Sequence, residues 1–518
     1  MSQRSCVAQL DALARLGLAT MLRPLPLAIA AGLANPALAQ SWVTRATLDA
    51  ESTATTNGGR APAGQQQRDL VLALRPTLAI QGDGPGLRVR ASVGFDAMIH
   101  AQSEIDPQFL PRVNGVVNAT LAERLLFVDA AVDVRRTAVD PYGPPADGFG
   151  VQNSRNATTL RLSPHFTRPW VDGMRWTVRH EATFSRSSDV RQADQQSERS
   201  EARIERRPAP WGGMVELTRQ EVQSSGAVES QWRVESARAA LDVAVGGDWV
   251  LGVLGGKEHS RFSLTAATDH RLGARLSWTP SERSQIKAEW ENRFFGSGWD
   301  LEVRHRTPML SLAMRWNRTP QLTTGSAGAV AAGADLATFL DAILTTRNPD
   351  PVARAVLVAS LIASRGLDPR VPVPTDVMAE YAQLQSGLQL SATLLGTRNV
   401  VAVSMYRQTL EQLVRDGNPF VPGAAADNRQ QGVAVTFSRR LTPRLSLNVR
   451  TSWSQITGLG DRRADQTRTQ SHRAGVVETV SNRSQWSAGL QLDRLSTTVI
   501  GTQGYRAAAV YVGIQHRF

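Results

Sequence analysis

The 518-residue sequence is poor in several residue types that many functions require. It has one cysteine, Cys6, and two lysines, Lys257 and Lys287, although lysine and arginine together number 58. One cysteine cannot form a disulfide within the chain. The eight histidines are scattered, and no G-x-S-x-G, H-E-x-x-H, P-loop or C-x-x-C motif occurs. The sequence therefore predicts no enzyme, no catalytic residues, no metal site and no cofactor.

Long hydrophobic runs are also scarce, and a mean hydropathy of −0.24 excludes a bundle of transmembrane helices. The one apolar run reads M-L-R-P-L-P-L-A-I-A-A-G-L-A-N-P-A-L-A from Met21, with Ala37-Leu38-Ala39 at its end. A basic start, a short apolar stretch and an A-x-A site are typical of a secretory signal peptide. We expect residues 1–39 to be this signal peptide, so Cys6 is absent from the mature chain.

The dominant positive feature is strict alternation of apolar and polar residues. Windows that begin at Leu87, Leu126, Met174 and Leu384 are apolar on one face and polar on the other. Soluble strands average about five or six residues. These runs are longer and match the roughly 9–11 residues of a tilted membrane strand. The pattern favours an outer-membrane barrel over a soluble sandwich.

The connections between these runs alternate between short turns and long polar loops, as in barrels with short periplasmic turns. The segment from Gly296 to Gly298 is the exception, since it is short where a long loop is expected. We predict an all-β, antiparallel up-and-down barrel of about 22 strands, within a range of 20–24. The barrel would occupy residues 40–319 and 381–518, with both termini in the periplasm.

Residues 320–380 break the alternation and predict a helical insertion. Its first helix would bury Leu336, Phe339, Leu340, Ile343 and Leu344, which recur at helical spacing. A second helix would start at Asp350-Pro351 and end at Gly366, a suitable residue after a helix end. Its apolar stripe would be Val352, Val356, Ala359 and Ile362. The sequence leaves open whether the insertion plugs the lumen or caps the mouth.

The polar faces of the strands carry many arginines. The candidate lumen-lining residues are Arg88, Arg90, Arg175, Arg179, Arg271, Arg275, Arg293, Arg304, Arg306, Glu289 and Glu291. Arginines in a pore can select anions or sugars. Arg and Glu can equally pair across strands and stiffen the wall. Because the arginines are spread singly along strands, we expect no nucleic-acid partner, despite the formal charge of +12.

The last strand ends the chain on an aromatic residue. Val510, Val512 and Ile514 form its apolar face and Phe518 follows, a pattern that resembles the terminal signal for barrel insertion. We expect this strand to pair with the first one, near Trp42 to Ala50. The expected location is the outer membrane. The expected partners are its lipid, lipopolysaccharide and the barrel-assembly machinery.

Several phrases occur in a distinctive order between residues 277 and 400. They are S-W-T-P-S-E-R-S from Ser277, E-N-R-F-F-G from Glu291, H-R-T-P from His305, N-P-D-P-V-A-R-A from Asn348 and G-T-R-N from Gly396. Together with Phe518, they resemble the outer-membrane β-barrel family associated with PEP-CTERM/exosortase exopolysaccharide loci. His516 departs from the pattern, because such terminal strands more often carry an aromatic residue there.

The resemblance implies a role in exopolysaccharide production or export, with the polysaccharide and its export proteins as partners. A general porin-like channel for small anionic solutes is the alternative that the inward arginines suggest. An outer-membrane lipid hydrolase is a remote third, because Ser and His need only meet in space.

Overall fold

The computed structural model describes residues 41–145, 153–170, 173–188, 194–225, 230–262, 265–321, 336–367, 382–413 and 427–518. The predicted signal peptide lies outside these ranges. Within them the chain forms 22 strands, two α-helices and a short 3-10 helix.

The first eleven strands are β1 Ser41–Thr55, β2 Asp69–Asp83, β3 Leu87–His100, β4 Gln108–Ala122, β5 Leu126–Ala138, β6 Ser154–Pro169, β7 Met174–Ser187, β8 Asp194–Arg206, β9 Trp211–Ser225, β10 Ser230–Val245 and β11 Trp249–Phe262. The others are β12 Thr265–Ser281, β13 Ser284–Arg293, β14 Gly296–Arg306, β15 Leu310–Gln321, β16 Gln383–Leu395, β17 Asn399–Gln412, β18 Asn428–Arg440, β19 Leu445–Gly458, β20 Gln466–Thr479, β21 Ser484–Thr497 and β22 Tyr505–Arg517. The helices are α4 Leu336–Leu344, α5 Pro351–Ser364 and η3 Gly460–Arg462.

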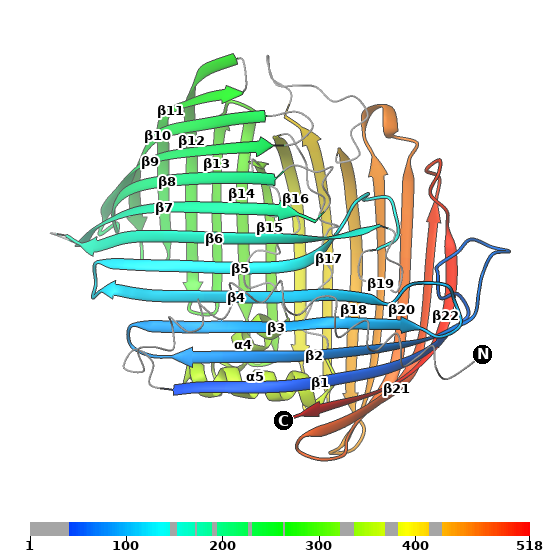
Figure 1. Ribbon diagram of the computed structural model, residues 1–518. Coiled ribbons are helices and arrows are strands. Elements are labelled where there is room, and N and C mark those ends of the chain that lie inside the picture. The colour runs from blue at the N-terminus through cyan, green and yellow to red at the C-terminus, as the bar shows by residue number, and fades with distance from the viewer. Residues whose placement is uncertain are drawn as a thin grey trace.

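Each strand pairs antiparallel with the next, and β22 returns to pair with β1, which closes the barrel (Figure 1). The predicted fold is therefore confirmed. The closing register runs from Thr47 opposite Arg517 to Thr55 opposite Ala509, so the predicted pairing with Trp42 to Ala50 is only partly right. The stagger that tilted barrel strands require carries the start of β1 past the end of β22.

The two faces of the sheet differ as the alternation predicts. On β2, Leu72, Leu74 and Leu78 are each more than 40% exposed, while Val71 and Ala73 on the opposite face are buried. An exposed apolar exterior suits lipid, and closure leaves no unpaired edge there. The protein is therefore an outer-membrane barrel, whose periplasmic end is the one with the short turns and Phe518.

The insertion lies between β15 and β16. All five residues of the first predicted stripe are buried on α4: Leu336, Phe339, Leu340, Ile343 and Leu344. On α5 the predicted stripe is only partly right: Ile362 packs toward α4 as predicted, but Val356 and Ala359 are exposed. Val358 and Leu361, which the stripe left out, pack there instead. Helix α5 is apolar on several sides, so residue spacing alone does not fix which side is buried. The side chain of Val352 lies outside the described structure.

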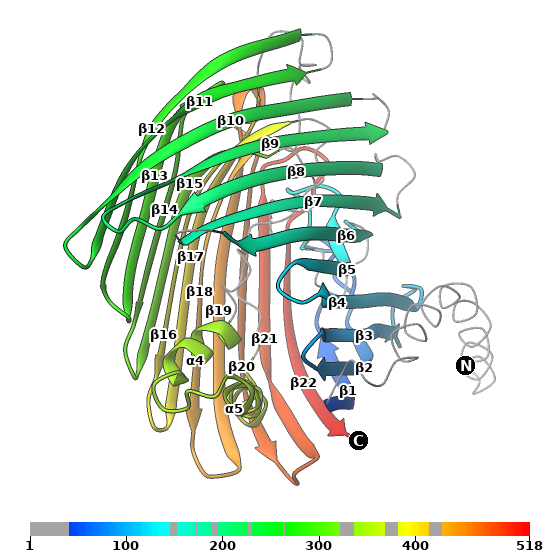
Figure 2. The ribbon, with the colours of Figure 1, turned by 90° about the vertical axis from the view of Figure 1, so that its left-hand side faces the viewer.

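The helices lie inside the lumen at its periplasmic end (Figure 2). They pack against Leu395 and Val400, which flank the short turn between β16 and β17. Both side chains are buried on the face opposite the exposed Leu394 and Val403. Among the described residues, no helix is long and apolar enough to cross a bilayer.

Candidate lumen site

A sharp bend of the sheet over β11 and β12 brings distant inward side chains together. Gly252 and Gly256 on β11 and Gly273 on β12 lie on the inner face of this bend. A Cβ on Gly252 would meet the carboxylate of Asp242, and one on Gly273 would meet the carbonyl oxygen of Trp290. Glycine is needed here because neighbouring groups fill the space that a side chain would occupy.

The space that these glycines leave allows the Arg238 side chain on β10 to cross β11 and β12 and reach β13. Its guanidinium donates to Glu216 on β9 at 2.8 Å. It also donates to Glu289 at 2.8 Å and to Glu291 at 2.6 Å, both on β13. One arginine therefore fastens β9, β10 and β13 together on the inner face.

Further pairs extend this cluster. Arg271 binds Glu291 and lies 3.8 Å from Glu258, to which Arg293 donates at 3.0 Å. We define the charge network as Glu216, Arg238, Asp242, Glu258, Arg271, Arg275, Glu289, Glu291 and Arg293, with Arg275 paired to Asp242. Four guanidinium groups face five carboxylates, so the network is close to neutral. Glu258 is fully buried, and Arg271 and Glu291 are 5% exposed.

The strand register places all eleven predicted lumen residues on the inner face. Five of them meet in the charge network: Arg271, Arg275, Arg293, Glu289 and Glu291. Four form separate contacts: Arg88 with Asp83 at 3.3 Å, Arg179 with Asp129 at 3.3 Å, Arg304 with Glu302, and Arg306 with the carbonyl oxygen of Glu282 at 3.4 Å. Arg90 and Arg175 are exposed, with no ion pair among the described residues.

Sequence reasoning missed four members of the network: Glu216, Arg238, Asp242 and Glu258. Each lies at an inward position of β9, β10 or β11, so alternation alone could have placed them on the lumen face. The glycines opposite Arg238 and Asp242 were the signal that these side chains reach beyond the neighbouring strand.

Arg365, just after α5, holds the insertion against the wall. Its guanidinium donates to the carbonyl oxygens of Thr397 and Arg398, both at 3.3 Å. Burial, with Arg440 nearby, lowers the pKa of Arg365. Gly366 follows with a φ of 58°, and Leu367 donates its backbone N–H to Ile362 at 2.9 Å, which completes a Schellman cap. The Schellman cap therefore ends α5, and the hydrogen bonds of Arg365 hold that end of the helix against the barrel wall.

At the outer mouth, residues 139–145, the described start of the β5–β6 connection, reach the ends of β19 to β21. Tyr142 is fully buried with Ile456 and Val499. Its backbone oxygen accepts from the Thr467 hydroxyl at 2.9 Å, and the Arg462 guanidinium lies 4.6 Å from its ring. Burial raises the pKa of Tyr142 to about 12. Residues 139–145 therefore narrow the mouth from one side.

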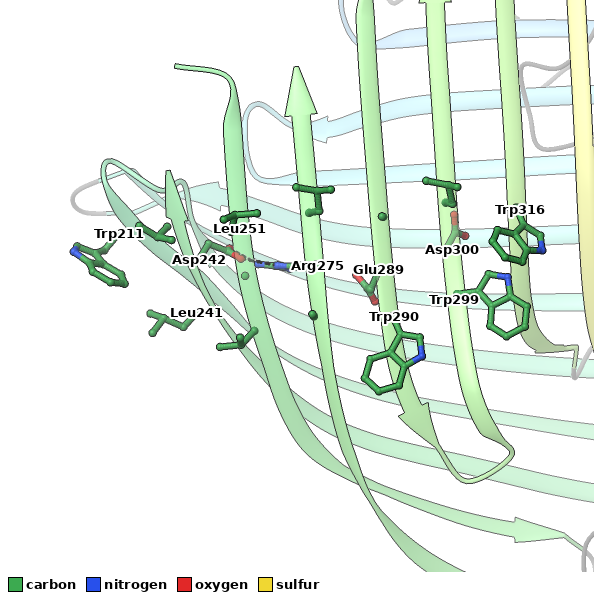
Figure 3. A pocket seen from close by; sticks show the side chains of 17 residues that line it. Trp211, Leu241, Asp242, Leu251, Arg275, Glu289, Trp290, Trp299, Asp300 and Trp316 are labelled. Carbon is green, nitrogen blue, oxygen red and sulfur yellow. Dashed lines mark hydrogen bonds and ion pairs between the residues drawn. The ribbon is translucent and has the colours of Figure 1, made fainter. Parts of the chain in front are cut away.

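The outer wall carries an apolar groove of about 650 Å³ over β9 to β15. Figure 3 shows Trp290, Trp299 and Trp316 side by side at one end and Trp211 at the other. The tryptophan side chains lie on the exposed apolar face, so the groove opens toward lipid. Asp242, Arg275 and Glu289 of the charge network are also among its lining residues.

The same face carries histidines paired with hydroxyl groups. Nδ1 of His305 lies 2.8 Å from Ser284, and Nδ1 of His516 lies 2.9 Å from Ser484. A hydrolytic triad needs an acid on the second ring nitrogen. In the described part of the chain, neither histidine has such a carboxylate partner. These pairs satisfy polar groups on a lipid-facing wall.

The predicted assembly residues lie at the closing strand. Val510, Val512 and Ile514 are 54, 46 and 37% exposed on the outer face. Phe518 is also exposed, and its backbone N–H donates to Ala46 at 3.0 Å. The terminal residue thus makes the last main-chain bond of the closing ladder.

No protein-family model and no curated protein matches this sequence. Similar solved structures include the siderophore receptor PirA from Pseudomonas aeruginosa, at 10% identity and a TM-score of 0.40, covering 92% of this chain and 80% of that one. A mutant of the ferric enterobactin receptor PfeA from the same species aligns at 10% identity and a TM-score of 0.46, covering 92% of this chain and 80% of that one. The ferric-catecholate import receptor Fiu from E. coli K12 aligns at 10% identity and a TM-score of 0.45, covering 91% of this chain and 81% of the receptor. The barrel assignment rests on the strand pairing of this chain itself.

Proposed function

We propose that the protein is a gated conduit of the outer membrane that works in exopolysaccharide secretion. The observation that carries the proposal is the position of α4 and α5 inside the lumen. They cover the inward apolar side chains Leu395 and Val400 near the periplasmic opening. A barrel of this strand number otherwise encloses a wide lumen.

The attachment of the insertion suits a movable plug. The insertion leaves the wall at Gln321 and rejoins it at Gln383, at the outer ends of β15 and β16. Its helices contact the opposite, periplasmic ends of the strands. They can therefore leave the lumen without breaking a main-chain pair between strands, at the cost of the Arg365 bonds and the apolar contacts with Leu395 and Val400.

The link to a saccharide comes from the phrases in residues 277–400 and from the charge network. A near-neutral set of guanidinium and carboxylate groups offers both donors and acceptors for hydroxyl groups. A strongly cationic lumen would instead favour small anions. The network thus supports a sugar polymer as cargo.

A porin for small anionic solutes is the second candidate. Arg90 and Arg175 favour it, because both are exposed on the inner face without an ion pair in the described structure. Anion selectivity of an open pore is the property that would distinguish it from the conduit.

Planar-bilayer conductance tests the proposal. The full chain should conduct poorly, whereas replacing residues 325–375 with a short Gly-Ser linker should open a large, weakly selective pore. A full chain that is already open and anion-selective would support the porin. Equal, low conductance of both proteins would contradict the gate.

A genetic experiment tests the cargo. Deletion of the gene should abolish secreted polysaccharide, and the full chain supplied in trans should restore it. Unchanged secretion in the deletion strain would contradict the link to exopolysaccharide while leaving the gate to the conductance measurement.

A further inference from the structure

In the described structure, the outer rim is lowest at the hairpin between β13 and β14, the two shortest strands. These strands have 10 and 11 residues, whereas β12 has 17. About 9–11 residues cross a bilayer, so the turn at Phe294-Phe295 lies at the level of the outer leaflet. Leu272 is the last residue of β12 that pairs with β13. From Leu272 toward its outer end, β12 continues to Thr265 and pairs there only with β11 in the described structure.

Two parts of the wall overlap above this hairpin (Figures 1 and 2). We call their contact the seam; it consists of Val222, Trp232 and Val234 from β9 and β10, Ala382, Leu384 and Leu413 beside or on β16 and β17, and Phe294 and Phe295 packed against them. Trp232 belongs to the inner face of its strand, whereas Leu384 shares the outer face of β16 with Leu394. The upper part of β9–β10 therefore lies over the outside of β16.

The seam is joined differently from the rest of the wall. Sequential strands are linked by continuous main-chain ladders, including β22 with β1. Across the seam, the described residues meet through apolar side chains, with no main-chain bond between β9–β10 and β16–β17. Opening the wall here breaks no ladder, so it costs less than separation of any neighbouring pair of strands.

The two sides of the seam differ in chemistry. Behind it lie the charge network and Ser260, which, like Glu258, is fully buried. Below it, on the lipid side, lies the apolar groove with Trp290, Trp299 and Trp316 (Figure 3). A molecule with a polar head and acyl chains fits this combination, because the groove faces membrane lipid and the network offers hydrogen bonds.

We propose that the seam is a lateral portal through which a lipid-linked saccharide passes between the lumen and the outer leaflet. Its sugar head contacts the charge network and its acyl chains occupy the tryptophan groove. This inference rests on the proposed conduit function and names the class of cargo and its route through the wall.

Lateral access can be measured with a reactive lipid. The mature protein with Ser260→Cys, which is then its one cysteine, is reconstituted in vesicles that contain a lipid with a maleimide head group. Formation of the protein–lipid adduct is followed by gel shift. Leu384→Ser, which loosens the seam, should accelerate adduct formation at least tenfold. Leu390→Ser, the same change on the outer face of the same strand but outside the seam, should leave the rate unchanged.

Heat-modifiable migration identifies the folded barrel in each variant, and only that band is scored. An unchanged rate with Leu384→Ser, or equal acceleration by both variants, would overturn the portal. Acceleration confined to a water-soluble maleimide would also overturn it, because the seam would then open to water and not to lipid. The conductance of the linker variant tests the conduit separately, so failure of one proposal is distinguishable from failure of the other.

Discussion

Single residues decide how tightly the wall bends. Gly273 leaves room for the carbonyl oxygen of Trp290, and Gly256 leaves room for the backbone of Ala237. This closeness lets Arg238 reach carboxylates on β13. Alternation in the sequence predicted that Arg271 and Glu291 face inward. It could not predict that Arg238 on β10 reaches Glu291 on β13, because that contact depends on curvature rather than on the spacing of residues.

A methyl group at the bend should be enough to disturb it. Gly273→Ala places a Cβ against main-chain atoms, and overpacking of this kind costs about 1–3 kcal/mol. The midpoint of heat-modifiable migration in detergent should fall. Gly247→Ala is the control, because nothing lies near that position. Equal midpoints for the two variants would contradict the tight bend.

Glu291 should be more important for stability than an exposed acid. Removing one partner of a buried ion pair costs about 3–5 kcal/mol, so Glu291→Gln should lower the urea midpoint strongly. Asp194→Asn is the control, since the pair of Asp194 with Arg186 is largely exposed and such pairs contribute about 0–1 kcal/mol. Similar losses in both variants would argue against a buried network.

Tyr142 should make the outer mouth sensitive to alkali. Its pKa is raised to about 12 by burial, against roughly 10 for a solvated tyrosine. The unfolded or detached form therefore loses its proton first, and stability falls as pH rises from about 10 to 12. Protease cleavage of the β5–β6 connection should accelerate over this range. Tyr142→Phe should abolish the pH dependence, and a persistent dependence would contradict the assignment.

At the scale of elements, the insertion shows when a sequence pattern predicts the buried side of a helix and when it does not. The burial of α4 followed from its single apolar stripe. The burial of α5 did not, because apolar residues such as Val356 and Val358 lie on different sides of that helix. Plug and cap were equally compatible with the sequence, since the choice depends on contacts with Leu395 and Val400 from a later strand pair.

Arg365 should hold the plug in place. Arg365→Ala removes two hydrogen bonds to main-chain oxygens, and each is worth about 1.5–3 kcal/mol when the donor is charged. Openings in single-channel recordings should therefore become at least tenfold more frequent. Arg347→Ala, at an exposed position between the helices, is the control. An unaltered opening frequency in Arg365→Ala would argue against this attachment.

At the scale of the whole molecule, long alternating strands and regular turns were sufficient to predict the number of strands and closure. The register of closure was not predictable, because stagger is a property of the complete barrel. The seam was equally hidden, since it joins strands that are distant in the sequence. The sequence feature that indicated the seam was the short segment at Gly296, where a long loop was expected.

Deletion of Phe518 should impair assembly and not ligand binding. The deletion removes the final bond to Ala46 and the aromatic side chain that contacts His516. The amount of heat-modifiable protein in the outer membrane should fall severalfold, whereas Phe518→Tyr should preserve it. Normal insertion of the shortened chain would contradict the role of the last residue.

The pairing of β22 with β1 also orders events in time. Ala508 donates its backbone N–H to Thr56, a residue 452 positions earlier in the chain. One edge of β1 thus has no partner until almost the entire polypeptide has been synthesised and secreted. Unpaired edges recruit other chains, and contacts so distant in sequence form slowly. The nascent chain therefore carries an open strand edge for nearly its whole transit.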